Sequence, residues 1–232
     1  MIRLITLDLD NTLWDVNPVI RNAEKALVAW LKENVPESLE HYHKDTFIAF
    51  RNKVVADNPD LASLPTTFRK MLLNHCFELA GLSADAIAEA TETSFRVFHQ
   101  ARNQIAFYED TLPLLKTLSQ DFSLIALSNG NADVQMVGLG DYFAAHFSAE
   151  STGKPKPDPA MFTAALEHLA IAPEQAIHIG DHPLEDVEAA QNVGFRTIWF
   201  NEDRKQDEKA CVPDRQVHQL NQIVSAVQDL LD

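Results

Sequence analysis

The stretch Asp8-Leu9-Asp10-Asn11-Thr12 closes an apolar run that begins at Ile2. Residues two apart in a β-strand point to the same face, so we expect the carboxylates of Asp8 and Asp10 to share one small volume. Two negative charges at such a short separation need a cation or a shared proton to relieve their repulsion. Oxygen ligands of this kind suit Mg²⁺, and a carboxylate can also act as a nucleophile or as a general acid and base. A strand end with turn-forming Asp and Asn side chains is the alternative interpretation.

Length and composition limit the class of protein. The 232 residues are enough for one large domain or for a core with an insertion. The formal charge of -15 disfavours a nucleic-acid surface, which needs basic side chains. No apolar run is long enough to span a membrane, and the start of the chain lacks the features of a signal peptide, so we expect a cytoplasmic protein. The two cysteines, Cys76 and Cys211, lie far apart and do not suggest a disulfide framework.

A long helical segment follows the first strand. Asn17-Pro18 is typical of a helix start, and apolar residues recur at helical spacing from there to about residue 104. Breaks at Pro36, Asn58-Pro59 and Gly81 divide this segment into four amphipathic helices. The pattern predicts a small helical bundle, residues 16–104, inserted into a core formed by residues 1–15 and 105–232.

The second half of the chain alternates between apolar strands and helices, which predicts an α/β fold with a parallel sheet covered on both faces. The predicted strands are 122–127, 146–148, 176–179 and 196–200; a short helix is expected before Gly138, and 216–220 is ambiguous. Ligands of open α/β sheets bind beyond the carboxyl ends of the strands. We therefore expect Asp8, Ser128 and Asp181, which each follow a strand, to meet at one edge.

Three further polar clusters stand near those strand ends. In Ser128-Asn129-Gly130, a hydroxyl, an amide and a backbone N–H can hold phosphate oxygens. Lys154-Pro155-Lys156 offers a cation, and Gly180-Asp181 with the later Asp186 offers two more carboxylates. Asp181 can complete a metal site, while Asp186 can orient its neighbours or cap a helix. Each cluster taken alone is equally typical of a turn, a solvated loop or a helix cap.

Together, the order and spacing of these clusters resemble the haloacid dehalogenase-like hydrolase superfamily over nearly the whole chain. The matching residues are Asp8, Asp10, Thr12, Ser128, Lys156, Gly180, Asp181 and Asp186. The resemblance implies a Rossmannoid core with a central parallel sheet, and it implies that the four-helix insertion is a cap domain.

The resemblance also implies a role for each matching residue. Asp8 would attack phosphorus, and Asp10 would protonate the leaving oxygen and then activate water. Mg²⁺ would be held by the carboxylates of Asp8 and Asp181 and by the main-chain carbonyl of Asp10.

The remaining matching residues would bind and neutralise the phosphoryl group. Ser128 would bind it with the region of Asn129 and Gly130, Lys156 would neutralise charge beside Asp8, and Thr12 and Asp186 would support the site. Lys154 is a second candidate for the cation. Lys156 is preferred because it stands six residues before Phe162, as in the family.

A bacterial branch of the superfamily is similar in three further stretches: Asn17-Pro18-Val19-Ile20, Ser128-Asn129-Gly130-Asn131-Ala132 and Gly138-Leu139-Gly140-Asp141-Tyr142-Phe143. That branch dephosphorylates FMN and 5-amino-6-(5-phosphoribitylamino)uracil. The implied function is a Mg²⁺-dependent phosphatase of a small phosphate monoester, acting as a monomer or a homodimer.

Three alternatives remain open. A metal-independent 2-haloacid dehalogenase has the same fold, but such enzymes lack the second carboxylate that Asp10 provides. A phosphomutase keeps both carboxylates. A non-catalytic binding module would have lost a catalytic residue, and none of the matching residues is missing here.

Overall fold

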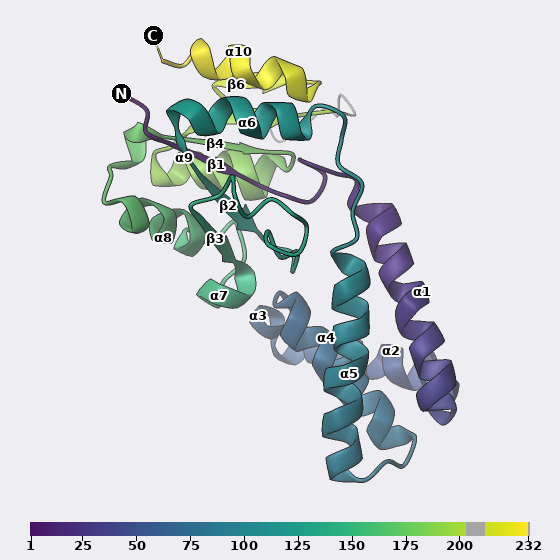
Figure 1. Ribbon diagram of the computed structural model, residues 1–232. Helices are drawn as coiled ribbons and strands as arrows, with labels where there is room; N and C mark the ends of the chain where they lie inside the picture. The colour runs from purple at the N-terminus through teal and green to yellow at the C-terminus, as the bar shows by residue number, and fades with distance from the viewer. Residues whose placement is uncertain (203–211, 232) are drawn as a thin grey trace. The chain divides into compact units, whose positions relative to one another are not determined.

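The computed structural model describes residues 1–202 and 212–231, which belong to two compact units (Figure 1). The α/β unit consists of residues 1–16 and 106–232, and the helical unit consists of residues 17–105. Residues 203–211, which include Cys211, fall outside the described residues. Within the described ranges, every helix is too short or too polar to cross a lipid bilayer.

The α/β unit is built on six parallel strands in the order β3-β2-β1-β4-β5-β6. They are β1 (Leu4–Leu7), β2 (Ser123–Ser128), β3 (Ala145–Ser148), β4 (Ala176–Gly180), β5 (Arg196–Phe200) and β6 (Arg215–Val217). This confirms the predicted α/β class with its central parallel sheet. The register places Leu7 of β1 beside Ala126 of β2 and Ile179 of β4. The carboxyl ends of β1, β2 and β4 therefore lie together at one edge.

Helices cover both faces of the sheet, which is why its central strands are largely apolar. In Figure 1, α6 and α10 lie on one face, and α8 and α9 lie on the other. The helical elements of this unit are α6 (Thr111–Asp121), α7 (Ala149–Thr152), α8 (Ala160–Leu169), η2 (Pro173–Gln175), the π-helical turn η3 (Pro183–Glu188), α9 (Ala189–Val193), η4 (Leu220–Gln222) and α10 (Ile223–Gln228). Central positions such as Ile5, Ile125 and Ile177 are fully buried.

The helical unit contains the four predicted amphipathic helices and two short pieces. They are α1 (Val16–Asn34), η1 (Pro36–Glu40), α2 (Asp45–Asp57), α3 (Pro59–Ala62), α4 (Pro65–Leu79) and α5 (Ala84–Arg102). Ala23, Leu27 and Leu31 recur every four residues on α1, and all three are fully buried in a core with Phe77 and Phe98. The unit thus has a hydrophobic core of its own.

Two local predictions were wrong. Helix α1 begins at Val16, one residue before the start indicated by Asn17-Pro18, and its first N–H donates to the Asn11 side chain at 3.2 Å. The short helix expected before Gly138 is a series of turns, in which the Asp133 carboxylate accepts from the N–H of Gln135 at 2.8 Å. At α1 the Asn11 side chain accepts from the first helical N–H, which lets the helix begin one residue earlier. Before Gly138 the Asp133 side chain provides the turn hydrogen bond in place of a helical carbonyl.

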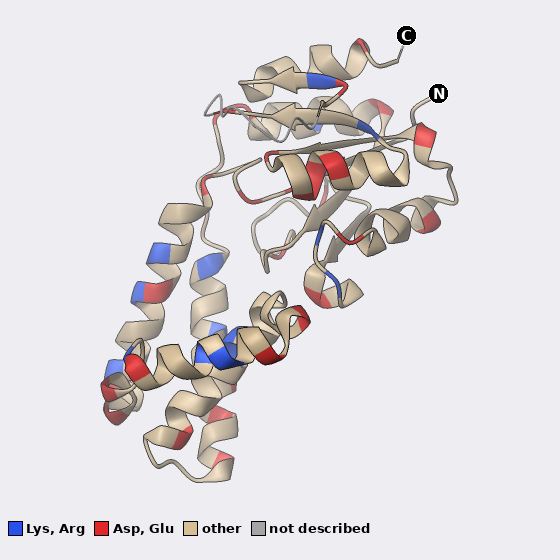
Figure 2. Cartoon of the chain, turned by 180° about the vertical axis from the view of Figure 1, so that it is seen from behind, with Lys and Arg blue, Asp and Glu red and all other residues tan. Residues whose placement is uncertain are grey.

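Charge is divided unevenly between the two units. The α/β unit carries 9 Lys and Arg against 23 Asp and Glu, a net charge of -14. The helical unit carries 10 against 11, a net charge of -1. Figure 2 shows basic side chains distributed along several helices of the helical unit. The acidity of the chain is therefore a property of the α/β unit.

Candidate active site

Asp8 follows β1 directly and opens a tight turn. The carbonyl of Leu9 accepts from the N–H of Leu13 at 2.9 Å, and the N–H of Asn11 donates to the carbonyl of Trp14 at 2.7 Å. Asn11 takes a left-handed conformation with φ 61°, which Asn tolerates better than most residues. The turn brings Trp14 alongside Asp10, and the indole Nε1 donates to Asp10 Oδ1 at 2.8 Å.

The ammonium group of Lys156 occupies the centre of the site. Its Nζ donates to Asp8 Oδ1 at 2.7 Å, to Asp186 Oδ1 at 2.6 Å and to the carbonyl of Leu127 at 2.9 Å. Lys156 is 2% exposed, and Asp186 is equally buried. Of the two candidate lysines in the sequence, the structure therefore places Lys156 against Asp8.

Asp186 is held on both of its oxygens. His178 Nε2 donates to Oδ1 at 3.1 Å, and the N–H of His182 donates to Oδ2 at 2.9 Å. A Cβ atom at Gly180 would overlap the Asp186 side chain, so the glycine is what lets this carboxylate approach β4. With Lys156 as a third donor, Asp186 is placed to orient the lysine.

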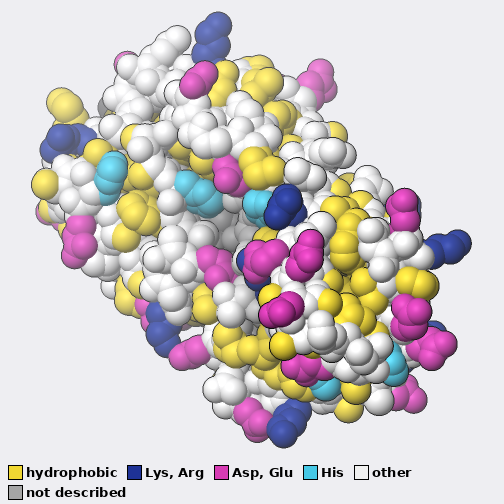
Figure 3. Space-filling model, turned by 60° about the horizontal axis from the view of Figure 1, so that its bottom comes forward, with side chains coloured by type: hydrophobic (Ala, Val, Ile, Leu, Met, Phe, Trp, Pro, Cys, Tyr) yellow, Lys and Arg dark blue, Asp and Glu magenta, His cyan; other side chains and the backbone are white. Residues whose placement is uncertain are grey.

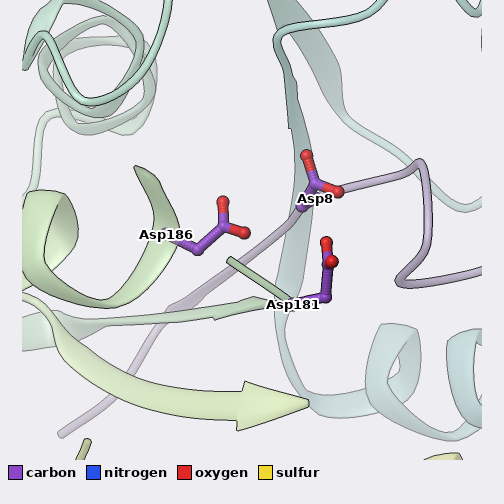
Figure 4. A group of neighbouring side chains, drawn as sticks. All are labelled: Asp8, Asp181 and Asp186. Carbon is purple, nitrogen blue, oxygen red and sulfur yellow. The ribbon is translucent and has the colours of Figure 1, made fainter. Parts of the chain in front are cut away.

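Asp8, Asp181 and Asp186 form a group whose carboxylate oxygens lie within 4.8 Å of one another (Figure 4). The Thr12 hydroxyl lies 3.3 Å from Asp8 Oδ2 and 3.5 Å from Asp181 Oδ1, and it links these two residues. The indole of Trp199 donates to the Asp181 carbonyl at 2.9 Å and fixes its main chain. An all-oxygen donor set of this kind fits a hard cation such as Mg²⁺.

The carboxyls in this group differ in their ionisation. Burial raises the pKa of Asp8 well above its ordinary value, and the charges of Asp186 and Asp181 raise it further, while Lys156 opposes them. Burial also acts to raise the pKa of Asp186, but Lys156 and His178 outweigh it and hold that pKa below its ordinary value. Asp8 is thus the carboxylate that has most to gain from an added cation.

Asn129 binds the backbone of Lys156, whereas its place in the sequence suggested a role in binding phosphate. Its Nδ2 donates to the Lys156 carbonyl and to Glu185 Oε2, both at 2.9 Å, and its Oδ1 accepts from the Lys156 N–H at 2.7 Å. The amide therefore clamps the backbone that carries the lysine. Next to it, the buried Ser128 hydroxyl accepts from the N–H of Gly130 at 3.0 Å, and both residues stand at the end of β2.

Sequence reasoning missed several residues that hold the site in place: His178, Trp199 and Glu185. His178 could have been found. It is a fully buried polar residue of β4 that pairs in register with Thr6 of β1, another polar residue in an apolar strand. The Thr6 hydroxyl lies 2.7 Å from His178 Nδ1. Two polar residues on neighbouring central strands need each other as partners, since buried polar groups are nearly always hydrogen-bonded.

Comparison with known proteins agrees with this arrangement. Residues 2–194 match the model of the haloacid dehalogenase-like hydrolase family. The chain is 30% identical to the 5-amino-6-(5-phospho-D-ribitylamino)uracil phosphatase YigB of Escherichia coli, over 86% of this chain and 83% of the relative. It is 31% identical to a phosphoserine phosphatase of Thermus thermophilus, over 72% of this chain and 68% of the relative.

A solved structure described as a 2-haloacid dehalogenase from Pseudomonas syringae superposes with a TM-score of 0.92, at 37% identity over 99% of both chains. The chain belongs to the haloacid dehalogenase-like hydrolase family. It is an enzyme of the hydrolase class, with phosphatases among its relatives.

Proposed function

We propose that this protein is a Mg²⁺-dependent phosphatase that hydrolyses a small phosphate monoester through an aspartyl-phosphate on Asp8. The observation that carries the proposal is the pairing of two carboxylates with different surroundings. Asp8 is buried against the Lys156 ammonium at 2.7 Å, while Asp10 is half-buried and bonded to the Trp14 indole at 2.8 Å. These surroundings support a role as nucleophile for Asp8 and a role as proton carrier for Asp10.

In the first step, an oxygen of Asp8 forms a bond to phosphorus while the bond from phosphorus to the leaving oxygen breaks. Asp10 gives its proton to that oxygen, so the product leaves as a neutral alcohol. In the second step, Asp10 takes a proton from water as the water oxygen attacks phosphorus. The bond from phosphorus to Asp8 then breaks and restores the carboxylate. Phosphate-monoester hydrolysis is among the slowest uncatalysed reactions, so both steps depend on this positioning.

The neighbouring groups hold the charge that develops on the phosphoryl oxygens. Lys156 keeps its proton, since the carboxylates of Asp186 and Asp8 outweigh burial and raise the pKa of the lysine above its ordinary value. Ser128 and Gly130 stand at the same edge of the sheet, where a hydroxyl and an N–H suit phosphate oxygens. Asp8 and Asp181 would hold the metal ion, because Asp186 already has three donors. When bound, Mg²⁺ would supply positive charge to the phosphoryl group.

The substrate that the comparisons favour is a phosphorylated intermediate or product of riboflavin metabolism. The relative YigB is described as a 5-amino-6-(5-phospho-D-ribitylamino)uracil phosphatase and matches 86% of the chain. We include FMN because it carries the same ribityl phosphate beside a larger heterocycle. Both compounds place a phosphate monoester on a flexible chain that ends in a flat ring.

We assign the choice of leaving group to the helical unit, as a cap. The unit has a hollow of about 670 Å³, with walls that are largely apolar and aromatic. Its lining includes Tyr42, Phe47, Phe68 and the exposed Arg51. Figure 3 shows hydrophobic side chains gathered on the visible face of this unit, bordered by charged ones. A pocket of this volume and character suits a flat organic group.

A metal-independent dehalogenase is the second candidate, favoured by the 37% identity to a structure described as one. Two features of the site speak for a phosphatase instead. A departing halide needs no proton, so Asp10 would have no task. A metal-independent reaction would also leave the group of Asp8, Asp181 and Asp186 without the cation that relieves the repulsion between its carboxylates.

The test is turnover by metal-stripped enzyme before and after addition of Mg²⁺. FMN, p-nitrophenyl phosphate and 2-chloropropionate would be supplied separately, without a bisphosphate primer. We expect phosphate release from the first two only with Mg²⁺, and no chloride release. Full turnover in excess EDTA, or chloride release, would overturn the proposal. A requirement for a bisphosphate primer would indicate a phosphomutase.

A further inference from the structure

Asp10 must present one particular oxygen to the leaving group, and the structure shows what distinguishes its two oxygens. The Trp14 indole Nε1 donates to Oδ1 at 2.8 Å. An indole N–H can only donate, so the oxygen that it meets must accept. A carbonyl oxygen is a better acceptor than a hydroxyl oxygen, so this contact favours Oδ2 as the atom through which Asp10 gives a proton. When Asp10 is ionised, the same contact holds the carboxylate in the orientation from which Oδ2 can take a proton from water.

The indole itself is fixed on several sides. Trp14 has no exposed surface and is among the largest fully buried side chains in the described part of the chain. Its ring meets the edge of Phe107, with centroids 6.1 Å apart and planes at 64°. The preceding carbonyl, that of Leu13, accepts from the N–H of Tyr108 at 3.0 Å and from the Thr111 hydroxyl at 2.8 Å.

These contacts join the two places where the chain passes between the units. It leaves the α/β unit after Val16 and returns to it at Ala106. Trp14 stands just before the first crossing, and Phe107 stands just after the second. The Trp14 indole, which donates to Asp10, is therefore held by residues of both connecting segments, and not only by the turn that carries it.

We propose that Trp14 is a positioning residue for general acid catalysis, fixing Oδ2 of Asp10 as the atom that gives its proton to the leaving oxygen. The inference rests on the proposed phosphatase function and adds a residue to it. It predicts a selective defect. Substrates with basic leaving groups, which need the proton, should depend on Trp14, and substrates with weakly basic leaving groups should not.

The experiment replaces Trp14 by 3-benzothienylalanine, in which sulfur takes the place of the indole N–H. This analogue keeps the shape of the ring and its packing against Phe107, so it removes the donor without creating a cavity. The matched control is the same replacement at Trp30, a half-buried residue of α1 in the helical unit. Trp14→Phe serves as a second, genetically encoded variant. Circular dichroism checks the fold of each protein.

The readout is the slope of log kcat/KM against the leaving-group pKa for aryl phosphates from p-nitrophenyl to phenyl phosphate, with Mg²⁺ present. We expect the slope to steepen at position 14, with a loss of about tenfold for phenyl phosphate and less than about twofold for p-nitrophenyl phosphate. The Trp30 control should keep the wild-type slope. Each slope compares substrates within one protein preparation, so a difference in folded fraction between preparations does not affect it.

A parallel fall for all substrates, or an unchanged slope in an active protein, would overturn the positioning role. In that case Trp14 would be a packing residue only. A wild-type protein that hydrolyses none of the aryl phosphates would instead contradict the proposed phosphatase function. The two failures are thus distinguished by the wild-type control alone.

Discussion

The α/β unit buries a cluster of carboxylates around one ammonium group, whereas the ion pair of Arg69 and Glu24 in the helical unit is partly exposed. In the α/β unit, Lys156 and Asp186 are each 2% exposed and Asp8 is 7% exposed. In the helical unit, the side chains of Arg69 and Glu24 pair at 2.6 Å with about a quarter of their surface exposed. Burying charge is costly even when it is paired, so stability alone does not explain the first arrangement. The contrast supports our proposal that the α/β unit performs the chemistry.

The largest effect is expected at the nucleophile, and it tests whether chemistry resides in the α/β unit. Asp8→Asn should lower kcat by about 10⁴-fold or more, because an amide is a far weaker nucleophile than a carboxylate. Steady-state phosphate release measures the effect. The matched control is Asp121→Asn, an exposed aspartate at the end of α6 in the same unit, which should keep wild-type kcat. Near-normal turnover in the Asp8 variant would remove it from the mechanism.

The second effect sharpens the comparison of the two kinds of ion pair. Lys156→Met leaves Asp8 and Asp186 buried without their shared cation, and should lower the free energy of unfolding by about 3–5 kcal/mol. Arg69→Met removes a partly exposed pair in the helical unit and should cost about 1 kcal/mol. Urea denaturation of both variants measures the difference. Equal losses of unfolding free energy would mean that burial does not determine how much these ion pairs contribute to stability.

These two predictions depend on residues that the sequence revealed to different degrees. The ends of β1, β2 and β4 could be placed because parallel strands align their carboxyl ends, whatever the details of the side chains. That rule alone brings Asp8, Ser128 and Asp181 to one edge. Lys156 was found through its spacing from Phe162, since no strand precedes it directly.

The bonds between side chains could not be predicted in this way. The clamp from Asn129 to Lys156 spans 27 residues, and the bond between Thr6 and His178 spans 172. Whether such groups meet depends on turn geometry and strand register, which hydrophobic periodicity does not encode. The helical unit shows the converse: its periodicity predicted four helices, but no pattern indicated which residues line its hollow.

The third prediction tests whether the helical unit selects the leaving group. Arg51→Ala removes a cation from the lining of the hollow, and should change the ratio of kcat/KM for FMN and p-nitrophenyl phosphate by about tenfold, the value of one interaction with a charged group. Binding energy from remote parts of a substrate can be expressed in kcat as well as in KM, so the comparison uses kcat/KM.

Lys53→Ala provides the matched control for Arg51. Lys53 is an exposed cation on the same helix and is absent from the lining of the hollow. It should keep the wild-type ratio of the two substrates. If the two variants changed the ratio equally, the effect would come from the net charge of the helix. If neither changed it, the hollow would not contact the leaving group through Arg51.

The smallest effect concerns a half-buried histidine of the α/β unit that is not part of the site. Burial lowers the pKa of His146 below its ordinary value, although the charge of Asp133 opposes this, and its Nε2 has no hydrogen-bond partner in the described part of the chain. The unfolded chain therefore takes up a proton near pH 6.5, while the folded protein takes it up only at lower pH. Stability from the neutral histidine is present above that pH and is lost as the pH falls.

His146→Leu should remove this pH dependence, because leucine does not titrate and fills the site with an apolar side chain. Relative to the wild type, the variant should gain about 1 kcal/mol in the free energy of unfolding between pH 7.5 and 5.5. Urea denaturation at the two pH values measures the gain. Other groups titrate in both proteins and cancel in the difference. A difference that stays constant with pH would show that His146 is protonated equally in the folded and unfolded states, and that burial in this unit does not control its charge.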